Sequence, residues 1–361
     1  MGDITGLDRI GIPVAVAVRP NSRALAVAQG KGATPVIARV SAIMEAADSW
    51  HAEDIADRFH RTSYAELAGC DSVADPAMLA RTAQAFDPAV VTDWIAATDL
   101  MGGGPCWLPA ECVSTDYRLP RAAGYGYFAA TTNGLAGGGH LLEAAITGIC
   151  EVIERDAVTL MHTSPDTGHH LRIDQDSVDD DGCCQLLARC AAAGMIVRLW
   201  NATSDLGVAT FRCELTDPTD PALRIYAGTA CHLSRAAALA GAIAEAAQAR
   251  LTIISGMRDD TVPDDYATEG PVAMAGFLAS LAPLGRADFH DAPDLASADL
   301  GADLRCLLGR LRGAGITRVA AVDLTDPDIG LPVVKIVVPG LEGRLGHPDY
   351  TPGRRSRRRR I

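Results

Sequence analysis

The sequence predicts an α+β fold in which mixed or antiparallel sheets pack against long helices. Three long apolar segments, which begin near residues 34, 141 and 234, show helical periodicity. Short β-branched runs such as IPVAVAV and VTDWIAATDL indicate strands between turn-forming stretches. Strands and helices do not alternate regularly, as they would in a doubly wound parallel sheet, so α+β is favoured.

The composition is that of a globular protein with an acidic body. The 361 residues are 48% hydrophobic and 21% charged, and we predict a single domain over residues 1–345. The formal net charge is -13, and six of the basic residues are arginines within the last eight positions. Because phosphate contacts need a basic face and the only basic block is this terminal run, the composition argues against a general nucleic-acid binder. We expect residues 346–361 to be a disordered, solvated basic tail.

The cysteines and the N-terminus indicate the compartment. Ten scattered cysteines include no CxxC pair, so structural zinc is not expected. Asp3 and Asp8 stand where a secretory signal requires positive charge, and the run IGIPVAVAV is short enough to be a strand. We therefore predict a cytoplasmic protein with reduced thiols and without a membrane or nucleic-acid partner.

The N-terminal third contains two strands and the first long helix. IPVAVAV and ALAVA flank the turn-forming RPNS, and QGKG leads into TPVIARVSAIMEAADSWHAEDI, whose Thr-Pro start favours a helix entry. Residues 62–120 are predicted to be an irregular, peripheral segment with short helical stretches at AELAG and PAMLARTAQAF and a strand at VTDWIAATDL. YGYFAATTN then predicts a strand that ends in the glycine-rich GLAGGG.

The rest of the chain is predicted to be a mixture of helices and strands. The second long helix runs to about residue 163, and the third is SRAAALAGAIAEAAQARLTIISG. The remaining helices are expected near 183–193, 271–281 and 299–313, and the remaining strands near 195–201, 206–215, 224–231, 316–324 and 332–339.

Each long helix gathers acids or amides on one side. At about 100° per residue, the members of each row lie on one face of their helix. The rows are Ser41, Glu45 and Asp48 on the first helix, Glu143, Glu151 and Glu154 on the second, and Glu245, Gln248 and Thr252 on the third.

These rows need a cation or open water, because like charges repel and carboxylates against an apolar core are unfavourable. Mg2+ fits, since it takes oxygen ligands and usually arrives with nucleotide phosphates, which Lys31 and Arg155 could bind directly. The alternative is that each row is simply the wet face of an amphipathic helix. A P-loop is excluded, because Leu25 and Gly32 replace the glycine and the Ser or Thr that this motif requires.

Four long stretches resemble the YcaO family over most of residues 5–343: TGLDRIGIPVAVAVRPNSRALAVAQGKGATPVIARVSAIMEAAD, NGLAGGGHLLEAAITGICEVIERDA, EAAQARLTIISGMRDD and DLTDPDIGLPVVKIVVPGLEG. The resemblance implies a YcaO-like fold that binds ATP and Mg2+ without a P-loop. The ATP-binding residues that we infer from the matching positions, together with Lys31, are Ser41, Glu45, Glu143, Arg155, Glu245 and Gln248. The implied metal ligands are Glu45, Asp48, Glu143, Glu151 and Glu154.

The resemblance also implies a reaction, the ATP-dependent O-phosphorylation of a peptide backbone amide. A sulfide equivalent gives a thioamide, whereas a Cys, Ser or Thr side chain gives an azoline. PDIGLPVVKIVVPGLEG is typical of the thioamide branch, whose members are associated with a TfuA-like sulfur-delivery partner, and the PxPxP ending of many azoline-forming members is missing. We therefore expect a thioamide-forming enzyme that acts on a precursor peptide or protein, with a homodimer as its candidate assembly. An azoline-forming cyclodehydratase is the first alternative.

Four positions depart from the family pattern, and one of them, Arg344, interrupts a usually smoother GLEGP-like ending. Asp48 replaces a glutamate, Gly139 stands where relatives often have asparagine, and Ala28 where they often have serine. Asp48 keeps the charge of the row but shortens its reach by one methylene. These replacements motivate a second alternative, a non-catalytic nucleotide-binding maturation accessory.

Overall fold

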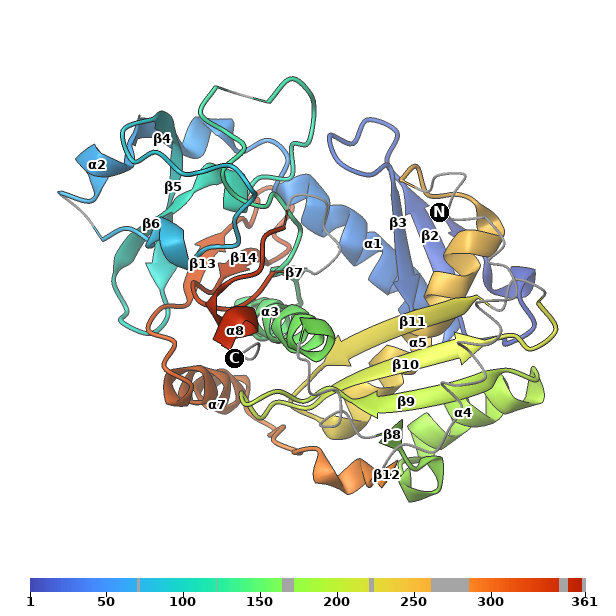
Figure 1. The fold of residues 1–361 in the computed structure, drawn as a ribbon. Helices are drawn as coiled ribbons and strands as arrows, with labels where there is room; N and C mark the ends of the chain where they lie inside the picture. The colour runs from blue at the N-terminus through green and yellow to red at the C-terminus, as the bar shows by residue number, and fades with distance from the viewer. Residues whose placement is uncertain are drawn as a thin grey trace.

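The computed structural model describes residues 1–69, 72–121, 123–163, 172–220, 224–260, 286–343 and 350–358. Within these ranges, helices pack with three largely antiparallel sheets, so the predicted α+β class is confirmed. Two of the long helices, α1 and α3, lie between the six-stranded sheet on one side and the other two sheets on the other (Figure 1).

The first sheet has the order β1-β2-β3 and carries α1 on one face. The Thr34 side chain accepts a hydrogen bond from the backbone N–H of Ile37, which caps α1. A Cβ on Gly30 would lie 2.0 Å from the backbone nitrogen of Ala42, so α1 rests directly on β3. The elements are β1 (Gly2–Asp3), β2 (Val14–Val18), β3 (Val27–Lys31) and α1 (Pro35–His51).

The second sheet has the order β11-β10-β9-β8-β12 and packs against α4 and α5. Leu199, Phe211 and Leu239 are fully buried between the sheet and these helices. A Cβ on Gly228 would lie 2.3 Å from the carbonyl oxygen of Ala242, so α5 also rests directly on β11. The elements are β8 (Arg172–Ile173), β9 (Ile196–Asn201), β10 (Thr210–Thr216), β11 (Ile225–Cys231), β12 (Arg286–Ala287), α4 (Asp181–Ala192) and α5 (Arg235–Ser255).

The third sheet has the order β4-β5-β13-β14-β7, with β6 paired to β5. Helix α3 packs on β14, where a Cβ on Gly148 would lie 2.8 Å from Cγ1 of Ile336. The elements are β4 (Phe59–Ser63), β5 (Val91–Asp99), β6 (Pro105–Pro109), β7 (Leu135–Gly137), β13 (Ala320–Asp323), β14 (Val333–Val337), α2 (Tyr64–Leu67), α3 (Leu141–Thr163) and α7 (Leu300–Gly313).

Several predicted elements differ from the structure. PAMLARTAQAF forms only the turn Pro76–Met78, and YGYFAATTN forms an isolated bridge at Phe128 instead of a strand. The backbone N–H groups of Gly126 and Phe128 donate to the Glu111 carboxylate, which takes the place of a strand partner. The segment expected to be peripheral supplies β5, an inner strand of the third sheet. The helix predicted near 271–281 lies outside the described residues.

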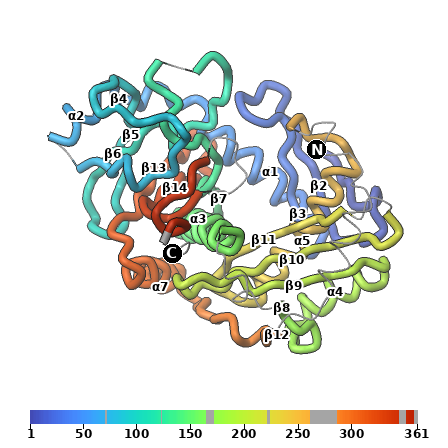
Figure 2. Tube along the Cα trace, in the orientation of Figure 1, coloured from blue at the N-terminus to red at the C-terminus, as the bar shows by residue number. Residues whose placement is uncertain are grey.

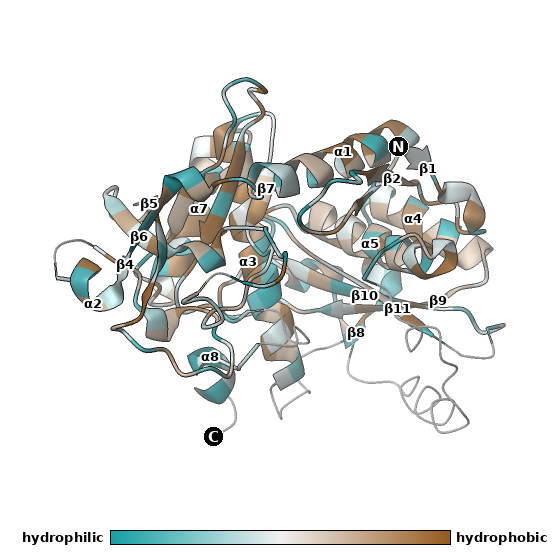
Figure 3. Cartoon of the chain, turned by 90° about the horizontal axis from the view of Figure 1, so that it is seen from above, coloured by the Kyte–Doolittle hydropathy of each residue, from teal (hydrophilic) through white to brown (hydrophobic). Residues whose placement is uncertain are grey.

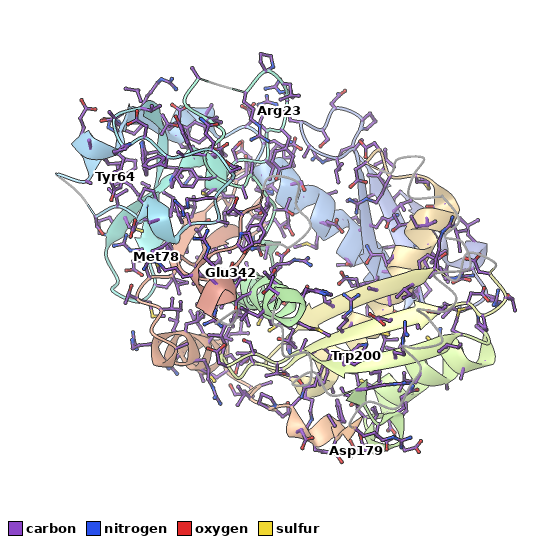
Figure 4. The ribbon with its side chains drawn as sticks, viewed as in Figure 1. Arg23, Tyr64, Met78, Asp179, Trp200 and Glu342 are labelled. Atoms are coloured by element: carbon purple, nitrogen blue, oxygen red, sulfur yellow. The ribbon has the colours of Figure 1, made fainter. Side chains whose placement is uncertain are left out.

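The C-terminal residues also differ from the expected tail, because 350–358 pack against the body and include α8 (Arg354–Arg358). The Arg355 guanidinium donates to both oxygens of Asp156, a fully buried carboxylate of α3, at 2.9 and 3.0 Å. Glu342, which Figure 4 labels close to α8 and α3, accepts hydrogen bonds from the backbone N–H of Gly353 and Ser356. This segment, red in Figure 2, is therefore anchored on α3.

Replacing Arg355 by alanine should lower the free energy of unfolding by about 3 kcal/mol, because the buried Asp156 carboxylate loses its cationic partner and keeps only the hydrogen bond from the Glu342 backbone N–H. Burial already raises the pKa of Asp156 to about 6, with Arg355 opposing that rise. Urea unfolding at pH 7 measures the effect, with the exposed neighbour Arg354→Ala as the control. Equal stability of the two variants would show that the contact contributes nothing.

The apolar side chains of α3 and α5 are largely buried, whereas α1 exposes Val36, Ile37, Val40 and Ile43. Among the described residues, α5 alone is long and apolar enough to cross a membrane, and half of its apolar window is buried against the protein, as in an ordinary core helix. Figure 3 shows α1 between β7 and β2, and a largely hydrophilic α8, as its arginines require.

The nine cysteines in the described ranges are free thiols, while Cys70 lies outside these ranges.

Candidate functional site

The acidic row of α1 lies against the glycine-rich turn after β7. The Asp48 carboxylate occupies the space beside Gly137, where a Cβ would lie 2.4 Å from Asp48 Oδ1. Desolvation raises the pKa of Asp48 to about 7, and the nearby carboxylates of Glu45 and Glu151 add to the rise. Glu45 is exposed, yet desolvation by the surrounding protein raises its pKa as well, with Lys31 opposing and Glu151 adding to the effect. The α1 row and the α3 row are therefore electrostatic neighbours.

The α3 row is held by both backbone and side-chain partners. Glu151 accepts a hydrogen bond from the backbone N–H of Gly134 at 3.1 Å, and Glu143 accepts one from Gly139 at 2.8 Å. Glu154 is only 7% exposed, and it accepts a hydrogen bond from the Thr229 hydroxyl at 2.6 Å. Glu143 thus binds the turn before its own helix, whereas Glu151 and Glu154 join α3 to neighbouring segments.

Arg155 pairs with two acids of its own helix, α3. Its guanidinium lies 3.1 Å from Glu154 and 3.5 Å from Glu151. Desolvation raises the pKa of Glu154 to about 7, with Arg155 opposing the rise and Glu245 of α5 adding to it. The Glu154 carboxyl therefore interacts with acids of both its own row and the α5 row.

The α5 row meets β3. Lys31 Nζ lies 3.3 Å from the Glu245 carboxylate, and the Gln248 amide donates to the carbonyl oxygen of Gln29 at 3.1 Å. Arg250 lies on another face of α5, as its helical position predicts, and pairs with Asp8. The sequence residues Lys31, Glu45 and Glu245 are thus brought together from three different elements.

In the ranges that the structure describes, no three carboxylate, histidine or cysteine side chains converge closely enough to hold a metal ion. The chemistry of the neighbourhood nevertheless fits a cation. Asp48 Oδ1 is buried and has no hydrogen-bond partner among the described residues, and several carboxyl groups there have raised pKa values. A divalent cation bridging the α1 and α3 rows directly or through waters would relieve both conditions.

Asp48 should make the stability of the ligand-free protein depend on pH. A carboxyl whose pKa is raised on folding, here from 3.8 to about 7, contributes stability at low pH that is lost as the pH rises through about 7. Asp48→Asn should therefore gain roughly 2 kcal/mol relative to wild type between pH 5 and pH 8. Parallel urea titrations without Mg2+ measure the difference, and a difference that stays constant with pH would contradict the shifted pKa.

Sequence reasoning missed Lys335, which belongs to the same neighbourhood. It is 1% exposed in β14, and its Nζ donates to the carbonyl oxygen of Thr131 at 2.6 Å. Burial lowers its pKa to about 8, while the Glu151 carboxylate raises it. One signal was available: a charged residue interrupts the buried apolar run VVKIVV.

Two cavities lie beyond the C-terminal end of α1. Their volumes are about 770 and 740 Å3, and both are lined by Arg23, Glu53 and Asp54. The buried His51 Nε2 in the first cavity and the Tyr117 hydroxyl in the second have no hydrogen-bond partner among the described residues. The two cavities offer a polar space that begins about one helical turn past Asp48.

Comparison with known proteins identifies relatives along most of the chain. A family model described as YcaO cyclodehydratase, ATP- and Mg2+-binding, matches residues 29–342. An uncharacterized protein of Methanothermobacter thermautotrophicus is 36% identical over 362 residues, which is 98% of this chain and 92% of that protein. A Rhizobium leguminosarum bv. trifolii protein from the tfuA 3′ region is 33% identical over 351 residues, covering 95% of this chain and 83% of that protein.

Solved structures show the same fold. YcaO from Methanopyrus kandleri, bound with AMPPCP and Mg2+, has a TM-score of 0.71 and 24% identity, covering 93% of this chain and 84% of that one. A heterocyclase in complex with substrate and cofactor has a TM-score of 0.76 and 23% identity over 92% of this chain. The match covers only 48% of the heterocyclase, so this chain spans about half its length.

Proposed function

The chain belongs to the YcaO family, and on this premise we propose that it activates a backbone amide of a ribosomally made peptide or protein, with a sulfide equivalent as the nucleophile and a thioamide as the product. ATP and Mg2+ are the cofactors that the description of the family names. The electrostatic coupling of the three acidic rows, together with the ion pairs that Lys31 and Arg155 make with them, is the observation that supports the proposal.

Each candidate residue has a role in this proposal. Bound ATP supplies the phosphoryl group, and Mg2+ offsets the charge of its phosphates. The carboxylates Glu45, Asp48, Glu143, Glu151 and Glu154 hold the metal, directly or through water. Lys31 and Arg155 exchange part of their present ion pairs for phosphate oxygens, while Ser41, Glu245 and Gln248 orient the nucleotide. Most of the catalytic effect is then positioning and charge stabilisation.

The proposed chemistry is balanced by phosphate release. The sulfur adds to the amide carbon, and the amide oxygen takes the terminal phosphoryl group of ATP. The carbon–oxygen bond then breaks, phosphate leaves, and the sulfur loses its proton to form the carbon–sulfur double bond. ATP is converted to ADP and phosphate, and one oxygen of the peptide is replaced by one sulfur.

The thioamide product and its partner rest on two observations. The stretch PDIGLPVVKIVVPGLEG, which includes β14, is typical of the thioamide branch. A relative 33% identical to this chain comes from a tfuA region, which supports a TfuA-like protein as the partner that delivers sulfur. The two cavities past α1, which Arg23, Glu53 and Asp54 line with charged side chains, are our candidate path for the peptide.

Mass spectrometry tests the product. The purified chain is incubated with ATP, Mg2+, sulfide, a TfuA-like partner and a candidate peptide encoded beside its gene. Exchange of oxygen for sulfur in the peptide supports the proposal, and loss of one water without sulfur uptake would replace it by azoline formation. The description of the family as cyclodehydratase makes azoline formation the second candidate.

The non-catalytic alternative has a separate signature. An accessory protein would bind ATP saturably without releasing phosphate, with any peptide and partner tried. Two replaced positions retain site contacts: Asp48 still neighbours Glu45 and Glu151, and the Gly139 N–H still binds Glu143. We therefore expect calorimetry to detect ATP binding and a phosphate-release assay to detect peptide-stimulated turnover.

A further inference from the structure

Lysine is almost absent from this chain. Only two of its 32 Lys and Arg residues are lysine, namely Lys31 and Lys335. Both lie beside the acidic rows, since Lys31 pairs with Glu245 and Lys335 interacts with Glu151. Arginine carries the positive charge everywhere else, so the compact ammonium group occurs only at this site.

Lys335 and Glu151 both form hydrogen bonds with the backbone of residues 131–134. Lys335 Nζ donates to the Thr131 carbonyl oxygen, and the Gly134 N–H, three residues later, donates to Glu151. The backbone N–H of Ile336, the neighbour of Lys335, donates to the Gly134 carbonyl oxygen at 2.7 Å. Residues 131–134 are therefore clamped between β14 and α3, with a buried cation at one end and a candidate metal ligand at the other.

The ammonium group of Lys335 makes one hydrogen bond in the described part of the protein, although it can donate three. Its side chain is 1% exposed, so bulk water does not screen its charge. The field of a buried charge extends further than that of a surface charge. The Lys335 ammonium group therefore repels any cation that approaches Glu151.

We propose that Lys335 is a built-in counter-cation of the candidate metal site, which makes Mg2+ binding dependent on nucleotide. The inference rests on the proposed ATP and Mg2+ site but not on the identity of the product. Without nucleotide, Lys335 offsets the charge of Glu151 and repels bare Mg2+. With nucleotide, the phosphates add negative charge, so that metal and nucleotide bind as a pair.

The test compares Mg2+ binding by wild type, Lys335→Gln and Lys335→Met. Glutamine keeps a donor for the Thr131 carbonyl but loses the charge, and methionine loses both. Calorimetry without nucleotide should show bare Mg2+ binding about tenfold tighter in both variants. AMPPCP at saturating Mg2+ should bind several-fold more weakly to both. Arg198→Met, which removes a buried cation bound to Glu214 in β9 and β10, should leave Mg2+ affinity unchanged.

Several outcomes would overturn the inference. Mg2+ affinity that is unchanged or weaker in Lys335→Gln would remove the role of charge, and a change in Lys335→Met alone would assign the effect to the Thr131 contact. On the wild-type protein, which needs no variant to fold, tight binding of Mg2+ alone would also contradict it. If wild type fails to bind AMPPCP with Mg2+, the proposed function fails too. If it binds the pair but forms no thioamide, only the proposed product fails.

Discussion

Glu151→Gln is expected to lower peptide-stimulated ATP turnover by about 100-fold, which is the size of the loss when one preorganised electrostatic group is removed from an active site. The charge of Glu151 raises the pKa of both Glu45 and Asp48 on α1. Its carboxylate also lies beside the Arg155 guanidinium on α3. Glutamine keeps an oxygen that can accept the Gly134 hydrogen bond, so the fold should be retained while the charge is lost. Phosphate release at saturating ATP, Mg2+ and peptide measures the effect.

The matched control removes a carboxylate elsewhere. Asp181→Asn changes an exposed acid in the first turn of α4 and should leave turnover unaltered. Circular dichroism shows whether both variants keep wild-type structure. Wild-type turnover in Glu151→Gln would contradict the assignment of this helix to the metal site, although membership of the family would stand.

Gly30→Ala is expected to lower the free energy of unfolding by more than about 3 kcal/mol, in the range of severe overpacking. A Cβ at this position would lie 2.0 Å from the Ala42 nitrogen and 2.3 Å from the Ala38 carbonyl oxygen. Both contacts are backbone atoms of α1, so no side-chain rotation relieves them. The helix must move away from β3, which also displaces Ser41 and Glu45 from Lys31.

A glycine in open surroundings provides the control for this variant. Gly309 lies within α7, and a Cβ there would meet no atom within 4 Å. Gly309→Ala should raise stability by roughly 0.5 to 1 kcal/mol, because alanine loses less backbone entropy than glycine in a helix. Guanidinium unfolding of both variants and calorimetric ATP binding by Gly30→Ala make the comparison. Wild-type stability and ATP affinity in Gly30→Ala would show that α1 shifts at no cost.

The long helices could be predicted from the sequence because their signals are local. Apolar periodicity and a Thr-Pro entry predict α1, and its row of Ser41, Glu45 and Asp48 follows from helical geometry alone. Strands such as β4 and β7 were missed, since their partners, β5 and β14, lie far along the chain and pairing leaves little local pattern. YGYFAATTN has strand-like composition, yet the Glu111 carboxylate binds its backbone.

The candidate site could be predicted only in part for the same reason. The residues of each row were visible one helix at a time, but the ion pair between Lys31 and Glu245 depends on how α5 packs beside β3. Lys335 lies in β14, which packs against α3. This contact depends on the tertiary fold, so the sequence alone does not show that Lys335 is buried beside α3. The anchoring of Arg355 by Asp156 likewise joins residues almost 200 positions apart.

The anchored C-terminus makes α3 sensitive to whatever is attached to the end of the chain. Asp156, which binds Arg355, directly follows Arg155, so a load on the last residues is transmitted to the helix one position away from the candidate phosphate ligand. A change that pulls residues 350–358 away from the body should therefore alter nucleotide binding without touching the site, which calorimetric ATP binding measures. Displacement of residues 350–358 would therefore pull on the helix that carries Glu151, Glu154 and Arg155.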